Sequence, residues 1–83
     1  MIIFKKMKKI TIYTGPMCNY CEAAKRLLKR NNATYNEINI ATVDGAMEEM
    51  INKAKGKRTI PQIFFDDQHI GGYDEVRALG KRK

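Results

Sequence analysis

The chain has 83 residues, of which 43% are hydrophobic, and its formal net charge is +7. This length suits one small domain and is too short for two separate cores. The apolar stretches are only a few residues long, which excludes a membrane-spanning helix. The lysines follow the apolar residues 1–4, whereas a secretory signal carries its charges first. We therefore expect a cytoplasmic protein with no membrane partner.

The positive charge is concentrated at the two ends. Residues 1–9 contain four lysines and residues 81–83 are all basic, whereas residues 10–80 hold equal numbers of basic and acidic side chains. We predict a mobile basic extension over residues 1–9, a domain over 10–80 and a basic tail over 81–83. Charged ends on a neutral body favour solubilising tails. A nucleic-acid-binding arm is the alternative, but no aromatic platform is interleaved with the charges, so we expect no specific nucleic-acid partner.

The first half of the domain has two strands and two helices. Residues 9–13 alternate and are β-branched, which predicts a strand that ends before Gly15-Pro16. Residues 19–31 form an amphipathic helix that stops at Asn31-Asn32. Residues 35–40 are predicted to be a strand. A second helix follows, with Asp44 as its N-terminal cap, Gly56 beyond its end, and an apolar stripe of Met47, Met50, Ile51 and Ala54.

The second half predicts a hairpin and a short helix. Residues 63–65 and 68–70 flank a turn at Asp66-Asp67. Asp74 is predicted to cap a last helix of about two turns, which continues through Leu79 and stops at Gly80.

The predicted element order is therefore β-α-β-α-β-β-α. Because the first two strands are joined through a helix, they should lie parallel with a right-handed crossover. The hairpin adds an antiparallel pair. We predict an α/β fold with a four-stranded mixed sheet flanked by helices.

The only two cysteines, Cys18 and Cys21, follow the first strand and open the first helix. Cys18 lies where helix N–H groups are unpaired and the helix dipole is positive, so its pKa should fall below the free value of about 8.5. The thiolate is the nucleophile in disulfide exchange. Cys21 lies one turn further on, where it should be more buried and close enough to form a disulfide. The pair is predicted to be catalytic, with Cys18 attacking and Cys21 resolving.

Zinc binding is the main alternative for the cysteine pair. A structural zinc site usually needs four protein ligands, and His69 is the only other Cys or His in the chain. We therefore expect no metal site, and we expect His69 to be structural. Inert core cysteines fit poorly, because Cys18 follows a Gly-Pro-Met loop at an exposed helix start.

Two further loops contain candidate binding residues. Thr59-Ile60-Pro61 either delays entry into an edge strand or contains a cis X-Pro bond that presents the Ile60 backbone to a peptide-like substrate. Gly71-Gly72-Tyr73-Asp74 leads into a helix. Its glycines permit close backbone approach, and its helix start can bind a carboxylate while Asp74 meets an ammonium group.

Together these motifs resemble the glutaredoxin family over roughly residues 10–79. The resemblance implies a thioredoxin-like fold, a cis Pro61, and glutathione as electron donor and co-substrate. It rests on Ile12-Tyr13-Thr14, Cys18-Asn19-Tyr20-Cys21, Thr59-Ile60-Pro61-Gln62-Ile63-Phe64 and His69-Ile70-Gly71-Gly72-Tyr73-Asp74.

The resemblance also assigns roles to individual residues. Cys18 would be glutathionylated and Cys21 would resolve protein disulfides. Tyr20 would flank glutathione, and the Ile60 backbone would pair with its cysteinyl unit. The remaining implied site residues are Gly72 and Asp74 at the γ-glutamyl end, Lys57 or Arg58 at the glycyl carboxylate unless both are merely solvated, and Thr59, Pro61 and Tyr73 around them.

Three features depart from the family pattern. Asn19 stands where the dithiol motif usually has proline, and Gly15 stands where many relatives have lysine. The last helix is also shorter than in many relatives.

The resulting prediction is a monomeric glutathione-dependent thiol–disulfide oxidoreductase. Its partners would be glutathione, disulfide-containing or glutathionylated proteins and, indirectly, glutathione reductase. One alternative is a redoxin reduced by thioredoxin reductase, which the uncharged Gly15 allows and the Gly71–Asp74 motif opposes. Another is a [2Fe-2S] carrier with Cys18 from two chains and two glutathiones as ligands, which a resolving Cys21 disfavours.

Overall fold

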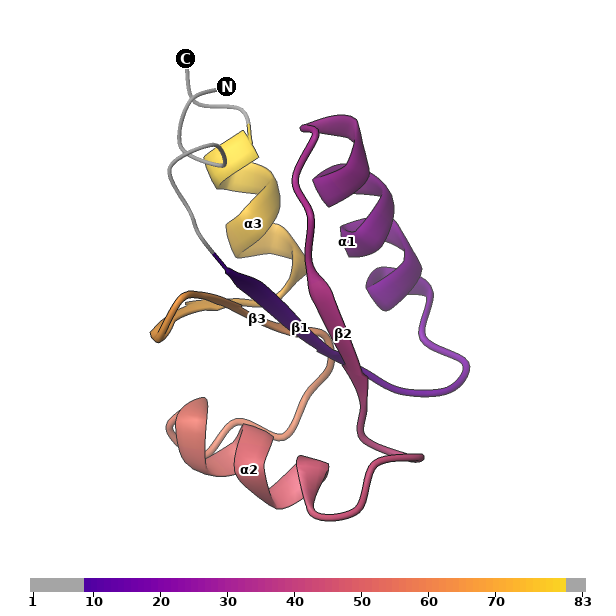
Figure 1. Ribbon diagram of the computed structural model, residues 1–83, viewed down its shortest axis with the longest axis vertical. Coiled ribbons are helices and arrows are strands. Elements are labelled where there is room, and N and C mark those ends of the chain that lie inside the picture. The colour runs from indigo at the N-terminus through magenta and orange to yellow at the C-terminus, as the bar shows by residue number, and fades with distance from the viewer. Residues whose placement is uncertain (1–8, 81–83) are drawn as a thin grey trace.

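The computed structural model describes residues 9–80, and its element order is the predicted one (Figure 1). The predicted basic ends lie outside the described residues except for Lys9. That residue is paired with the body, since its N–H donates to Asp66 Oδ1 at 3.0 Å and its carbonyl accepts from the Asp66 N–H at 2.6 Å. The elements are β1 (Ile10–Thr14), α1 (Asn19–Arg30), β2 (Asn36–Asn39), α2 (Ala46–Lys53), β3 (Gln62–Phe65), β4 (Gln68–Gly71) and α3 (Tyr73–Gly80).

The four strands form one mixed sheet in the order β2-β1-β3-β4. β1 and β2 are parallel, with Ile12 opposite Glu37, as the helical connection predicts. β1 and β3 are antiparallel, and so are β3 and β4, whose register shifts between Ile63 and Phe64. The predicted α/β architecture is confirmed, and α3 is the predicted short helix.

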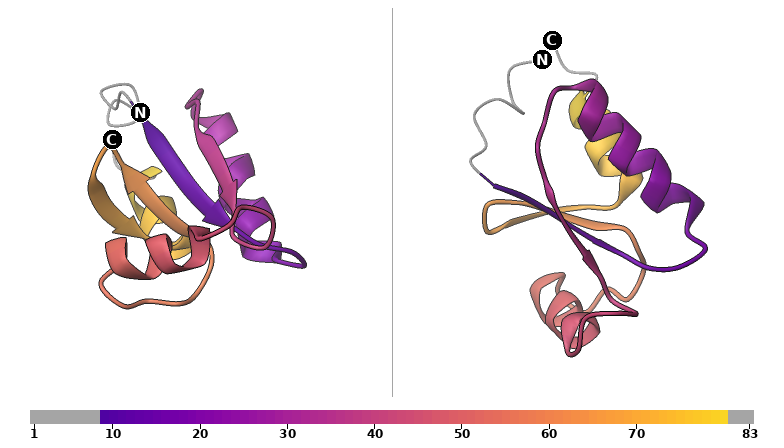
Figure 2. Two further views of the ribbon diagram at one scale, coloured as in Figure 1. Left: turned by 60° about the horizontal axis from the view of Figure 1, so that its bottom comes forward. Right: turned by 45° about the vertical axis from the view of Figure 1, so that its right-hand side comes forward.

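Helices cover both faces of the sheet. α1 and α3 lie on one face and α2 on the other (Figures 1 and 2). Successive strand residues point to opposite faces, so the central strands β1 and β3 supply both cores. Ile10 and Ile12 pack with residues of α1 and α3, whereas Tyr13 packs with Phe64 and with Met50 of α2. Truncating a fully buried side chain such as Leu28 to alanine should cost about 2–5 kcal/mol.

The start of α2 differs from the prediction. The helix begins at Ala46, and its cap is Gly45 in the left-handed conformation, with φ of 76°, so Asp44 is not the cap. Met47, predicted as a core residue, is 43% exposed. The buried line runs instead through Ala46, Met50 and Ala54, which are four residues apart and therefore share one face.

The start of α3 also differs. The helix begins at Tyr73, two residues before the start that a cap at Asp74 implies, and the Val76 N–H donates to the Gly72 carbonyl at 3.2 Å. The side chain that reaches back to the helix start belongs to Glu75, whose Oε1 accepts from the Gly72 N–H at 2.8 Å. Asp74 is therefore a first-turn residue and not the cap. Within residues 9–80, no helix is long and apolar enough to cross a membrane.

Candidate active site

Cys18 and Cys21 are joined by a disulfide, with their Cα atoms 5.2 Å apart. Cys18 is the N-terminal cap of α1, and its backbone is extended, with φ of −117° and ψ of 100°. Its sulfur accepts a hydrogen bond from the Cys21 N–H at 3.0 Å. In the reduced protein this hydrogen bond and the positive end of the helix dipole both favour a thiolate at Cys18.

The two sulfurs differ in accessibility. Cys21 is 1% exposed and lies inside the first turn of α1, whereas Cys18 is partly exposed. Met17, directly before Cys18, is fully exposed and has a positive φ of 54°, a conformation that a non-glycine residue rarely adopts. The buried position of Cys21 agrees with the prediction, and an approaching disulfide would reach Cys18 first.

The loop before β3 passes next to the reactive sulfur. The Ile60–Pro61 peptide bond is cis, as the resemblance implies. Cys18 Sγ lies 3.9 Å from the Ile60 carbonyl oxygen. This contact is a hydrogen bond only when Cys18 is a protonated thiol, because the disulfide sulfur carries no hydrogen.

Gly15 makes room for this loop. A Cβ atom at position 15 would lie 2.6 Å from Cδ1 of Ile60, so any side chain there requires the Ile60 side chain to move. Ile60 itself packs against the core between the sheet and α2. The Ile60 side chain therefore occupies the space that a side chain at position 15 would need.

A hollow of about 260 Å³ lies beside the cysteine loop. Seven of the nine predicted substrate-binding residues line it, although they come from three separate segments. Lys57 and Arg58 are not among the lining residues and are exposed in the stretch directly before Thr59. The lining consists of Tyr20, Thr59, Ile60, Pro61, Gly72, Tyr73, Asp74 and Glu75.

The walls of this hollow meet closely. A Cβ atom at Gly72 would lie 3.3 Å from the Pro61 carbonyl oxygen, so the two backbones approach to a distance that favours glycine. On the α1 side, the rings of Tyr20 and Tyr73 have centroids 5.8 Å apart. The hollow therefore has a close backbone approach between Gly72 and Pro61 and an aromatic pair, Tyr20 and Tyr73, among its lining residues.

A glutaredoxin family model matches residues 10–70. A probable glutaredoxin of Synechocystis sp. is 49% identical over 71 residues, which cover 86% of this chain and 81% of that protein. The solution structure of a Brucella melitensis glutaredoxin has a TM-score of 0.73 and 42% identity, with 88% and 78% of the two chains covered. A buckwheat glutaredoxin solved as a glutathione complex has a TM-score of 0.73 and 28% identity over 83% of this chain and 64% of that one.

The chain belongs to the glutaredoxin family. Its Cys18-x-x-Cys21 pair matches the dithiol type, and the fold is the thioredoxin-like fold that the resemblance implies. The protein is a glutathione-dependent thiol–disulfide oxidoreductase, in agreement with the prediction from sequence.

Glu75 is a lining residue of this glutaredoxin that the sequence analysis missed. The Gly72 N–H holds the pKa of the Glu75 carboxyl below its usual value. A glutamate three residues after the helix cap is the spacing of a capping box, in which the acid bonds the backbone N–H of the cap. The sequence Gly72-Tyr73-Asp74-Glu75 has that spacing, which is the signal that points to Glu75.

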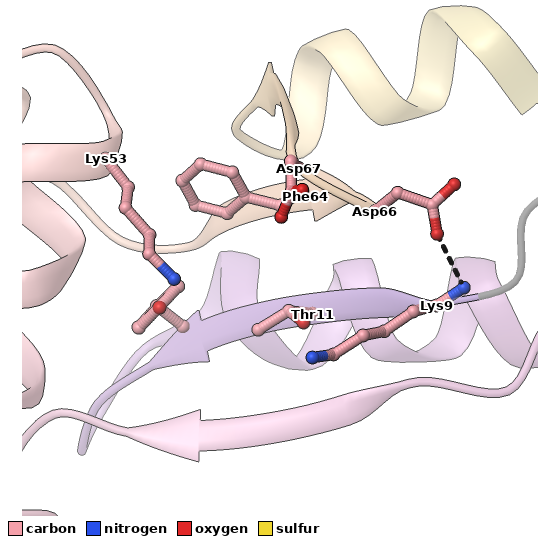
Figure 3. Close-up of a pocket in the computed structure, with 7 residues that line it drawn as sticks. Lys9, Thr11, Lys53, Phe64, Asp66 and Asp67 are labelled. Atoms are coloured by element: carbon pink, nitrogen blue, oxygen red, sulfur yellow. Dashed lines mark hydrogen bonds between the residues drawn. The ribbon is translucent and has the colours of Figure 1, made fainter.

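The glutaredoxin has a second hollow, of about 300 Å³, on the α2 face of the sheet (Figure 3). It is lined by Lys53 of α2 and by side chains of β1, β3 and the β3–β4 turn, with none from the cysteine loop. Two of its lining residues contact Glu49. The Tyr13 hydroxyl donates to Glu49 at 2.9 Å, and Lys53 forms an ion pair with Glu49 at 3.1 Å. Burial and the Glu49 contact raise the pKa of Tyr13, and the Tyr13 hydroxyl lowers that of Glu49.

Proposed function

We propose that Cys18 is the attacking thiol and that Cys21 is the resolving thiol of this glutaredoxin. The observation that carries the assignment is the difference between the two sulfurs. Cys18 is partly exposed and accepts a helix N–H, while Cys21 is 1% exposed. Disulfide exchange requires a thiolate with access to the substrate sulfur.

With a glutathionylated protein, the Cys18 thiolate attacks the glutathione sulfur. A bond forms between Cys18 and glutathione, and the substrate cysteine leaves as a thiolate that takes a proton from water. A second glutathione, as thiolate, then attacks the glutathione sulfur on Cys18 and is released as glutathione disulfide. Cys18 returns as a thiolate, and Cys21 takes no part in this cycle.

With a protein disulfide, Cys18 forms a mixed disulfide with one substrate cysteine, and the other leaves as a thiolate. Cys21 then attacks Cys18, which releases the reduced substrate and leaves the Cys18–Cys21 disulfide, the pairing found in the structure. Two glutathione molecules reduce that disulfide and leave as glutathione disulfide. Glutathione reductase returns the latter to glutathione with NADPH.

We place glutathione in the hollow beside Cys18, so that its sulfur meets that of Cys18. In this placement, Tyr20 flanks the tripeptide and the Ile60 backbone pairs with its cysteinyl unit. Gly72, Tyr73 and Asp74 hold the γ-glutamyl end at the start of α3. Thr59 and Pro61 complete the wall, and Lys57 or Arg58 attracts the glycyl carboxylate from outside the lining.

A coupled assay tests the donor and the division of labour together. Wild type and Cys21→Ser are supplied with NADPH, glutathione reductase, glutathione and a glutathionylated peptide. We expect both to turn over, and only wild type to reduce a protein disulfide through its dithiol. Equal loss of both activities in Cys21→Ser would contradict the assignment. No turnover by folded wild type would favour thioredoxin reductase as donor, or the [2Fe-2S] carrier if the protein purifies brown under anaerobic conditions.

We further propose a monomer that works in the cytoplasm and needs no metal. One chain carries both cysteines and every residue assigned to glutathione, so a second copy is not required. A dithiol that cycles also needs a reducing compartment, because disulfides persist in oxidising ones. Sedimentation equilibrium of the reduced protein tests the monomer directly.

A further inference from the structure

A hydrogen-bond relay through the buried side chain of Gln62 reaches Thr59 in the wall of the hollow. Gln62, at the start of β3, is 2% exposed, and its Nε2 donates to the Thr59 carbonyl at 2.9 Å and to Thr59 Oγ1 at 3.0 Å. At its other end, Gln62 Oε1 lies 2.7 Å from Nε2 of His69 on β4. The chain of contacts therefore runs from His69 through Gln62 to Thr59.

The chemistry of the three groups determines their orientation. The Thr59 carbonyl can only accept, so the Gln62 amide nitrogen must face it. The amide oxygen then faces His69, and the His69 Nε2 must carry a hydrogen to donate to it. If Nε2 were bare, two acceptors would face each other at 2.7 Å.

The His69 ring is held in place for this role. It lies against Phe64, with ring centroids 5.0 Å apart. Burial first, and then the charges of Lys55 and Lys57, lower the pKa of His69, against a smaller opposite effect of Glu75. A lowered pKa favours the neutral ring, and the facing Gln62 oxygen favours the tautomer with its hydrogen on Nε2.

We propose that His69 is a positioning residue for glutathione binding, because its Nε2–H anchors the Gln62 amide oxygen and so keeps the amide nitrogen on Thr59 in the wall of the hollow. This inference rests on the proposed placement of glutathione in that hollow. His69 is not a lining residue, so it acts only through Gln62 and Thr59. Without the His69 donor, the amide oxygen of the buried Gln62 side chain loses its partner, so the side chain is no longer held with its nitrogen on Thr59.

Two substitutions separate the hydrogen bond from the packing of the ring. His69→Phe keeps an aromatic ring on Phe64 and removes the donor. His69→Gln removes the ring and keeps an N–H the same number of bonds from Cβ. We expect His69→Phe to raise KM for a glutathionylated peptide about five-fold, the size of one lost hydrogen bond, with kcat unchanged. His69→Gln should stay close to wild type.

Exposed Gln68 on the same strand provides the control, since Gln68→Ala should change neither parameter. A KM for His69→Phe equal to that of wild type, or a larger effect of His69→Gln than of His69→Phe, would overturn the proposal. The double variant His69→Phe with Gln62→Met gives a further check. It should be no worse than Gln62→Met alone, and additive losses would contradict a relay.

An NMR measurement on the wild-type protein tests the relay without relying on enzyme activity or on the folding of a variant. His69 is the only histidine of the chain, so its ring nitrogens can be observed without overlap by ¹⁵N NMR. We expect the Nε2–H tautomer at pH 7, and a dominant Nδ1–H tautomer would overturn the relay. If wild type shows no turnover with glutathione, the proposed function fails, while the tautomer still decides whether the relay exists.

Discussion

The two hollows of this glutaredoxin are similar in volume, about 260 and 300 Å³, and differ in what builds them. The one beside Cys18 is formed where the Ile60–Pro61 backbone meets Gly72. The one on the α2 face is lined by charged ends of side chains such as Lys53, Asp66 and Asp67. Two of these side chains already have partners. Lys53 forms an ion pair with Glu49, and Asp66 accepts the backbone N–H of Lys9.

This difference shows that volume alone does not identify the active hollow. The first hollow has Ile60 in its lining, whose carbonyl oxygen lies 3.9 Å from Cys18 Sγ, and it offers backbone groups that a peptide-like ligand can pair with. The hollow on the α2 face has no lining residue from the cysteine loop, and the hydroxyl of its lining residue Tyr13 already donates to Glu49. We therefore expect substitutions around the first to change turnover and those around the second to change only stability.

The largest effect is expected from Cys18→Ser. Serine is a poor nucleophile toward disulfides, so both glutathionylated peptide and protein disulfide should lose turnover by about 10³-fold or more. The coupled assay measures this loss, with unfolding in urea as a check on the fold. Residual turnover within ten-fold of wild type would show that Cys18 is not the attacking thiol.

A substitution at the backbone contact should come next. Gly72→Ala places a Cβ atom 3.3 Å from the Pro61 carbonyl, so the two walls must separate. We expect a raised KM for glutathionylated peptide and a loss of about 1–3 kcal/mol in the free energy of unfolding. The steady-state kinetics and urea unfolding of the same preparation measure the two. An unchanged KM despite lost stability would place glutathione away from this contact.

The α2 face provides the contrasting prediction. Tyr13→Phe removes the hydrogen bond to Glu49 and should lower the free energy of unfolding by about 1 kcal/mol. KM and kcat should match wild type, because Tyr13 lines the hollow on the α2 face and not the one beside Cys18. If KM rose as it does for Gly72→Ala, the separation between the two hollows would be wrong.

The smallest effect concerns pH. The pKa of His69 is lowered in the folded protein. Below about pH 6.5, the unfolded chain therefore binds more protons at this residue than the folded protein does. Stability that is present above that pH should therefore decline as the pH falls from about 6.5 toward the lowered pKa of the folded protein. Urea midpoints of the disulfide form, in which neither cysteine titrates, measure the slope. His69→Phe should flatten it, and an unchanged slope would assign it to another group.

Sequence analysis identified the local features of the fold because these depend on neighbouring residues. The alternation in β1, the apolar face of α1 and the turn at Asp66-Asp67 each correspond to a structural period or a turn preference. The capping residues of α2 and α3, however, differ from the predicted ones. Gly45 rather than Asp44 starts α2, and Glu75 rather than Asp74 reaches back to Gly72.

The cysteine pair could also be assigned from sequence, since its position depends only on the strand before it and the helix after it. Physical reasoning also selected the two loops that supply most of the hollow, whereas Tyr20, Lys57 and Arg58 were implied only by the family resemblance. The exceptions are informative. Lys57 and Arg58 lie outside the lining, and Glu75 lies within it, because which side chains face a hollow depends on how separate loops meet.

By itself the sequence determined the order of the elements, the one-turn spacing of Cys18 and Cys21, and the dithiol chemistry that follows from a thiol at a helix start. Only the tertiary structure decided that Met47 points outward, that Ile60 packs over Gly15, and that His69 reaches Thr59 through Gln62. The physical reason is the sequence separation over which each interaction acts. Periodicity and capping act over a few residues, whereas these contacts join residues whose distance is set by how the sheet, the helices and the loops pack together.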